Sequence, residues 1–175
     1  MKMRKICSVL AIVFLLYVVM GIAEAAPLDY GAAGASMISD DEMTLPRMLT
    51  FALQDEYLAR GEYQVIIGKF GDRRPFSNII KAEEQHIAWL VPMFEKYGVP
   101  VPADRGIEFA QMPGSPAEAL QMGVNAENGN IEMYERFLRK ELPADVKAIF
   151  EHLLGASKNH LAAFQGKRGG GKSGF

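Results

Sequence analysis

The chain has 175 residues, of which 49% are hydrophobic and 23% charged, and its formal net charge is −2. This length and composition fit one globular domain and exclude a disordered, collagen-like or disulfide-rich protein. The near-neutral charge also argues against nucleic-acid binding, which needs an excess of Lys and Arg to neutralise phosphates.

The first 25 residues have the pattern of an export signal. A basic start (Met1 to Lys5) precedes an uncharged apolar run over 6–22, and Ala23-Glu24-Ala25 forms a small-x-small cleavage site. We therefore predict export to the periplasm or the extracellular space. The alternative is an uncleaved helix that anchors the chain in a membrane, because the apolar run is almost long enough to span a bilayer. Cleavage would remove Cys7, the only cysteine, and with it any thiolate ligand.

Two segments outside the core lack an apolar period. Residues 26–43 are rich in Gly, Ala, Ser and Asp, and we interpret them as a flexible linker. Residues 166–175 form a Gly/Lys tail, which we expect to be disordered.

Residues 44–165 carry four amphipathic helical stripes. Apolar residues recur every three or four positions from Leu45 to Phe70, from Phe76 to Tyr97, from Ala117 to Leu138 and from Val146 to Phe164. Ser115, followed by Pro116 and by Glu118, is typical of a helix start. Four such helices predict an all-α four-helix bundle. The proline-containing connection over 99–114 is long enough to cross the bundle and join two helical hairpins.

Ionisable residues interrupt each stripe near its middle. They are Glu56, Glu83 with His86, Glu127, and His160, the last preceded by Ser157. Buried carboxylates are costly unless they are paired or bind a metal, so a shared cation is the simplest explanation. Glu83 and His86 have the E-x-x-H spacing, which places both on one helix face. Carboxylate and imidazole ligands without a thiolate suit iron, manganese or zinc, and a mixed oxygen and nitrogen set around two ions favours iron or manganese.

The height of Glu56 depends on where the second helix begins. A start at Asp72 places Glu56 level with Glu83, whereas a start at Ser77 makes Glu62 the better candidate. Off the stripes, Glu62, Glu84, Glu132 and His152 are expected at the surface. Tyr63 and Tyr134 fit core positions better than a role at the metal, although they could donate hydrogen bonds to its ligands.

These motifs resemble the rubrerythrin-like branch of the ferritin-like superfamily. Glu56-Tyr57-Leu58-Ala59-Arg60 is similar to its first-helix E-x-x-A-R, and Ala82 to His86 is similar to its second-helix ligand pair. Ala126-Glu127 with Asn130, and Gly155 to Phe164, more closely resemble an uncharacterised family of exported ferritin-like domains.

The resemblance implies a ferritin-like bundle with a di-iron or di-manganese site that reacts with oxygen or peroxide. Its metal ligands would be Glu56, Glu83, His86, Glu127 and His160. Two departures matter, because Ser157 replaces the Glu of a second E-x-x-H and Asn130 stands where rubrerythrins often carry a carboxylate.

Three functions therefore remain open on sequence grounds. They are a di-metal oxidoreductase, a metal-binding or sequestering module without turnover, and a degenerate bundle that has lost its metal. Metal ions are the expected partners, and a membrane is one only if the signal stays uncleaved. A homodimer is compatible with the sequence. Trp89 is expected on the flank of its helix, and the sequence does not establish a subunit contact there.

Overall fold

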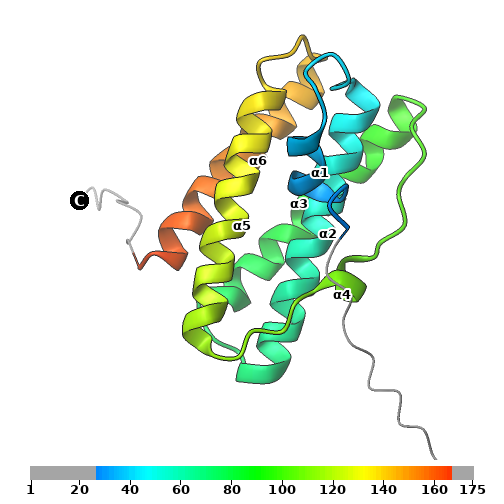
Figure 1. Cartoon of the computed structure of the whole chain (residues 1–175). Coiled ribbons are helices and arrows are strands. Elements are labelled where there is room, and N and C mark those ends of the chain that lie inside the picture. Colours follow the sequence, from blue (N-terminus) through cyan, green and yellow to red (C-terminus); the bar gives the residue numbers. More distant parts are fainter. Residues whose placement is uncertain (1–26, 167–175) are drawn as a thin grey trace, which may run out of the picture.

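The computed structural model describes residues 27–166, and every regular element in that range is a helix (Figure 1). The six helices are α1 (Gly31–Met37), α2 (Leu45–Phe70), α3 (Phe76–Lys96), α4 (Gly106–Phe109), α5 (Pro116–Phe137) and α6 (Ala144–Phe164). The predicted all-α class is confirmed, and the four predicted stripes correspond to α2, α3, α5 and α6. No helix within 27–166 is long and apolar enough to cross a membrane. The predicted export signal at 1–25 and the tail after Gly166 lie outside the described residues.

The long helices form two antiparallel hairpins. In the first, α2 ends at Phe70 and is capped by Gly71, whose N–H donates to the carbonyl of Ile67. The positive φ of Gly71, 84°, turns the chain away from the helix, and α3 begins after Pro75. In the second, α5 opens as predicted, because the Ser115 side chain accepts a hydrogen bond of 3.1 Å from the Glu118 N–H. The α6 helix follows Pro143 and returns along α5.

The crossover between the hairpins runs along α2 for much of the length of the bundle (Figure 1). Its short helix α4 touches α2 backbone to backbone. A Cβ on Gly106 would lie 1.8 Å from the carbonyl oxygen of Tyr57, and one on Gly61 would lie 2.5 Å from the Gly106 backbone. Only glycine allows this approach. An Arg60–Asp104 ion pair holds the same segment at the surface.

The segment at 26–43 differs from the predicted linker. Residues 31–37 form helix α1, which packs against α2 and α5 and buries Gly31, Gly34 and Ala35. The Ala32 N–H donates to Asp55 Oδ1 at 2.9 Å. Arg136 on α5 binds the carbonyls of Ala35 and Ile38 and the carboxylate of Asp40. Small residues and hydrogen bonds dock this helix, so its sequence carries no apolar period.

The buried apolar side chains fall into two groups along the bundle. One group includes Leu49, Phe94, Phe137 and Phe150, and the other includes Tyr63, Phe76, Ile79 and Phe164. The five sequence-predicted ligands belong to neither group and form a polar layer between them. On α2, for example, Tyr57 belongs to the first group and Ala59 to the second. The fold therefore keeps water away from this layer.

Candidate metal centre

The structure brings all five predicted site residues together in the interior. They come from four different helices and are buried, with exposed fractions of 1–9%. The residues are Glu56 on α2, Glu83 and His86 on α3, Glu127 on α5, and His160 on α6. Because buried carboxylates and imidazoles need partners, their convergence is the central feature of the site.

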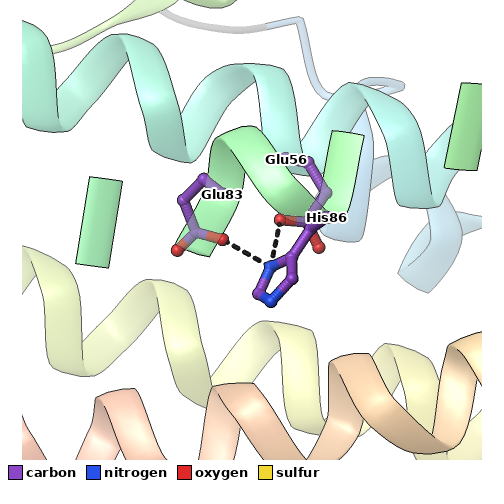
Figure 2. A group of neighbouring side chains, drawn as sticks. All are labelled: Glu56, Glu83 and His86. Carbon is purple, nitrogen blue, oxygen red and sulfur yellow. Dashed lines mark hydrogen bonds and ion pairs between the residues drawn. The ribbon is translucent and has the colours of Figure 1, made fainter. Parts of the chain in front are cut away.

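The first group of ligand atoms surrounds the His86 imidazole. His86 Nδ1 lies 2.8 Å from Glu83 Oε2 and 3.1 Å from Glu56 Oε2, as the dashed lines in Figure 2 mark. One ligand atom from each of these residues lies within 4.8 Å of the others. The predicted E-x-x-H pair and Glu56 thus direct their potential metal-binding atoms toward one point.

The second group surrounds the His160 imidazole. His160 Nδ1 lies 3.2 Å from Glu127 Oε1 and 3.3 Å from Glu83 Oε1. These three residues also offer ligand atoms within 4.8 Å of one another. Glu83 therefore belongs to both groups, with one carboxylate oxygen toward each imidazole.

Two tyrosines hold the outer carboxylates. Tyr134 donates to Glu56 Oε1 at 2.9 Å, and Tyr63 donates to Glu127 Oε1 at 3.3 Å. Each bond crosses from one hairpin to the other, since α2 and α3 form the first hairpin and α5 and α6 the second. The sequence favours core positions for these tyrosines, and in the structure both are core residues and also hydrogen-bond donors to the site.

The half of the site around Glu127 is less complete than the half around Glu56. Ser157 is buried there, at the position where a second E-x-x-H would have its carboxylate. Glu127 Oε2 and Asn130 Oδ1 are buried without a hydrogen-bond partner among the described residues. Buried acceptors without a donor are costly, so a cation or a water molecule at this position would remove an unfavourable feature. These two unpartnered oxygens show that the residues of the site fit a metal ion.

The electrostatics of the ligands follow from their mutual contacts. Burial alone would lower the pKa of His86, but the hydrogen bonds with Glu56 and Glu83 outweigh it and raise that pKa to about 10. The bonds with Glu127 and Glu83 similarly outweigh burial and raise the pKa of His160 to about 9. Burial raises the pKa of Glu56, whereas the two imidazoles hold the pKa of Glu83 below its usual range. In the metal-free protein, protons on the imidazoles thus take the place of metal charge.

This charge distribution predicts that the metal-free protein loses stability as the pH rises above neutrality. Each imidazole has a raised pKa in the folded state, so its contribution is complete below the ordinary value of 6.5 and is lost through about 9 for His160 and about 10 for His86. Melting temperatures recorded with chelator from pH 6 to 10 should fall. The melting temperature of a His86→Gln/His160→Gln double variant should fall less steeply with pH. Equal slopes for the variant and the wild type would contradict the prediction.

The contact between Glu56 and His86, rather than the start of α3, settles the choice between Glu56 and Glu62. The helix begins at Phe76, four residues after the start that levels Glu56 with Glu83, yet Glu56 reaches the site. The reason is that Glu56 contacts His86, which lies one helical turn beyond Glu83. Glu62 is half-buried, contrary to the predicted surface position, and lines a separate cavity with Asp55.

Two further residues lie near the site: Trp89, which the sequence analysis named, and Asp55, which it did not. Trp89 is 40% exposed, and its ring centre lies 5.6 Å from that of His86 and 5.8 Å from that of the exposed His152. Asp55, which is 8% exposed, was missed. Its partner is the backbone of α1, so no periodic signal in the sequence could have identified it.

Comparisons with known proteins support the fold. An uncharacterised protein from Methanocaldococcus jannaschii, MJ0754, is 28% identical over 126 residues, which cover 63% of this chain and 68% of that protein. Its crystal structure has a TM-score of 0.62 at 27% identity and covers 73% of this chain and 79% of that one. No protein-family model matches the chain.

A second solved structure extends the likeness to the fold alone. A conserved hypothetical protein from Mycobacterium tuberculosis, rv2844, has a TM-score of 0.60 at 17% identity and covers 83% of this chain and 99% of that one. Neither name states a function. The comparisons therefore place this chain beside helical proteins of unknown function, and membership of the ferritin-like superfamily stays a prediction from the sequence.

Proposed function

We propose that the chain binds two metal ions, iron or manganese, in a carboxylate and histidine centre bridged by Glu83. The observation that carries this proposal is the division of the Glu83 carboxylate, with Oε2 toward His86 and Oε1 toward His160. Each imidazole has its own second carboxylate, Glu56 or Glu127. A carboxylate shared by two similar donor sets is suited to bridging two cations.

The donor set favours iron or manganese over other ions. It consists of hard carboxylate oxygens and borderline imidazole nitrogens, and the five proposed ligands include no sulfur. A centre for Mg²⁺ or Ca²⁺ would use oxygen ligands almost entirely. The two imidazoles thus argue for a transition metal.

Two such ions would supply the electrons for reducing oxygen or peroxide, and the protein would supply their environment. Tyr134 and Tyr63 orient the carboxylates of Glu56 and Glu127 through their hydroxyl groups. The unpartnered Glu127 Oε2 is the site's free acceptor, and it can hold a proton or a water molecule. The apolar residues on both sides exclude bulk water.

A metal-free network is the second candidate, and one observation favours it. With both imidazoles protonated, the five residues satisfy most of their own charges and hydrogen bonds. A bundle that never binds metal would nonetheless leave Glu127 Oε2 and Asn130 Oδ1 unpartnered. This difference favours the metal-binding function.

We test the proposal with Trp89, the only tryptophan of the chain. Its ring lies next to His86, so binding of Fe²⁺ without oxygen, or of Mn²⁺, should quench its fluorescence. Quenching and elemental analysis should both saturate at about two ions per chain, and a chelator should reverse the quenching. His152→Gln serves as the control, because it changes the other ring beside Trp89 and leaves the centre intact.

The number of bound ions, together with their oxidation by peroxide or oxygen, separates the three functions left open by the sequence. Two ions, with oxidation of the ferrous protein by peroxide or oxygen, support an oxidoreductase. Two ions without oxidation support a binding or sequestering module. No bound metal at micromolar concentrations contradicts the proposal and leaves the metal-free network.

Export is the second part of the proposed function, and it rests on the signal pattern at 1–25. Cleavage after Ala25 should yield a mature protein that begins at Ala26. Intact-mass measurement of protein recovered from the periplasm or the medium checks this. Recovery of the full-length chain from the membrane fraction would instead support the anchored alternative.

A further inference from the structure

A cavity of about 650 Å³ lies between α1, α2 and α5, apart from the metal centre. None of the five proposed metal ligands lines it. Its volume is in the range of pockets that hold small organic molecules. The docking of α1 on Asp55 and Arg136 closes one side of this cavity, so it exists because 27–43 is folded.

The wall of the cavity is mainly apolar and is built from small side chains. Ala32, Ala35 and Ala59 contribute methyl groups, and Leu58 and Met133 add larger apolar surface. A pocket of this kind excludes water from the body of a ligand and leaves a few polar groups to determine which ligand binds.

The polar groups set into this wall are acidic. Asp55 is more than nine-tenths buried and lines the cavity, with Oδ1 bound to the Ala32 N–H. Glu62 is half-buried two helical turns further along α2, and it makes no ion pair within 27–166. Burial and the charge of Asp55 raise the pKa of Glu62 to about 7, as expected for a carboxylate without a cationic partner.

The basic residues of the lining do not neutralise these carboxylates. Arg136 is occupied by the carbonyls of Ala35 and Ile38 and by Asp40. Arg139 is exposed, as is Glu132, so these two belong to the rim of the cavity. The two interior carboxylates therefore lack a cationic partner, and a bound cation would favour their ionised forms.

We propose that this cavity binds a small organic amine, whose ammonium group pairs with the carboxylate of Glu62 and whose apolar body packs on the alanine-rich wall. An inorganic cation would pair with the carboxylates and leave the apolar wall uncovered. An organic anion would face two carboxylates. The ligand class thus follows from the combination of shape and charge, independently of any metal at the centre.

The experiment compares three probes of nearly equal shape with the full chain. They are phenethylamine, the neutral 2-phenylethanol and the anionic 3-phenylpropanoate. Binding is followed by NMR through the methyl resonance of Met133, which lines the cavity. We expect the amine to bind at least about tenfold more tightly than the other two, since one partly buried ion pair contributes about this factor.

A matched pair of variants shows which carboxylate pairs with the ammonium group. Glu62→Gln keeps the shape of the side chain and should weaken phenethylamine binding by about tenfold. Glu132→Gln removes a charge at the exposed rim and should change it less than about twofold. Quenching of Trp89 by Mn²⁺ should be the same in both variants, so a failure of the metal proposal would be visible separately.

Several results would overturn this inference. They are equal affinity for the amine and the alcohol, unchanged amine affinity in Glu62→Gln, or no shift of the Met133 methyl at millimolar amine. Glu62→Gln replaces a partly exposed side chain by its isostere, so we expect it to fold, and its melting curve checks this.

Discussion

Replacing Glu83 by Leu should abolish binding of both metal ions at once. Glu83 is the one residue shared by the two donor groups, so its loss leaves each position with a single carboxylate and a single imidazole. Each position has three donor residues, so losing one should remove about a third of its binding free energy and lower the affinity by at least about a hundredfold. Quenching of Trp89 by Mn²⁺ measures this loss.

The same substitution should also destabilise the metal-free protein. Glu83 accepts a hydrogen bond from His86 and forms an ion pair with His160, so a leucine removes charged contacts rather than an unpaired carboxylate. We expect a loss of roughly 1–3 kcal/mol in the free energy of unfolding, measured with chelator present. Glu84→Leu, at the exposed neighbouring position, is the matched control for both measurements. Wild-type metal affinity in Glu83→Leu would eliminate the proposed centre.

Replacing Ser157 by Glu should strengthen the weaker half of the centre. Ser157 is buried beside Glu127, where the sequence departs from a second E-x-x-H, and its hydroxyl is a poor ligand compared with a carboxylate. An added carboxylate ligand should raise the affinity for the second ion by about ten- to a hundredfold, if each ligand contributes roughly 1.4–3 kcal/mol. Metal should therefore raise the melting temperature more in Ser157→Glu than in the wild type.

The metal-free network leads to the opposite expectation for this variant. Without a cation, a further inward carboxylate beside Glu127 and Glu83 should cost several kcal/mol and recruit no ion. Ser157→Asp, with a shorter side chain, separates the effect of charge from that of crowding. If both variants melt earlier and bind no additional ion, the fourth helix does not take part in metal binding.

The sequence predicted the helices and the five inward ionisable residues because both depend on local periodicity. Glu83 and His86 interrupt an apolar stripe at helical spacing, and Ser115 caps its helix through a neighbour three residues away. These features are visible without knowing how the helices meet.

Features that depend on how the hairpins meet were not predictable in the same way. The Tyr134–Glu56 bond joins residues 78 positions apart, and it requires the relative height of α2 and α5. The sequence also left open the height of α3 relative to α2, and therefore whether Glu56 or Glu62 reaches the centre. In the structure Glu56 reaches it, and Glu62 lines the cavity. Helix α1 was missed because its partners, Asp55 and Arg136, lie elsewhere in the chain.

The position of the five ligands between two apolar groups has a consequence for cooperativity. The Leu49 group and the Tyr63 group are each packed within themselves and meet across a layer of ionisable side chains. In the metal-free state, the layer joins the two apolar groups through hydrogen bonds among charged side chains. These bonds can be replaced by bonds to water when the bundle opens locally. Ions held by ligands from all four long helices would tie the two ends into one unfolding unit. Metal loading would then change which parts of the bundle open together, as well as how often the whole bundle opens.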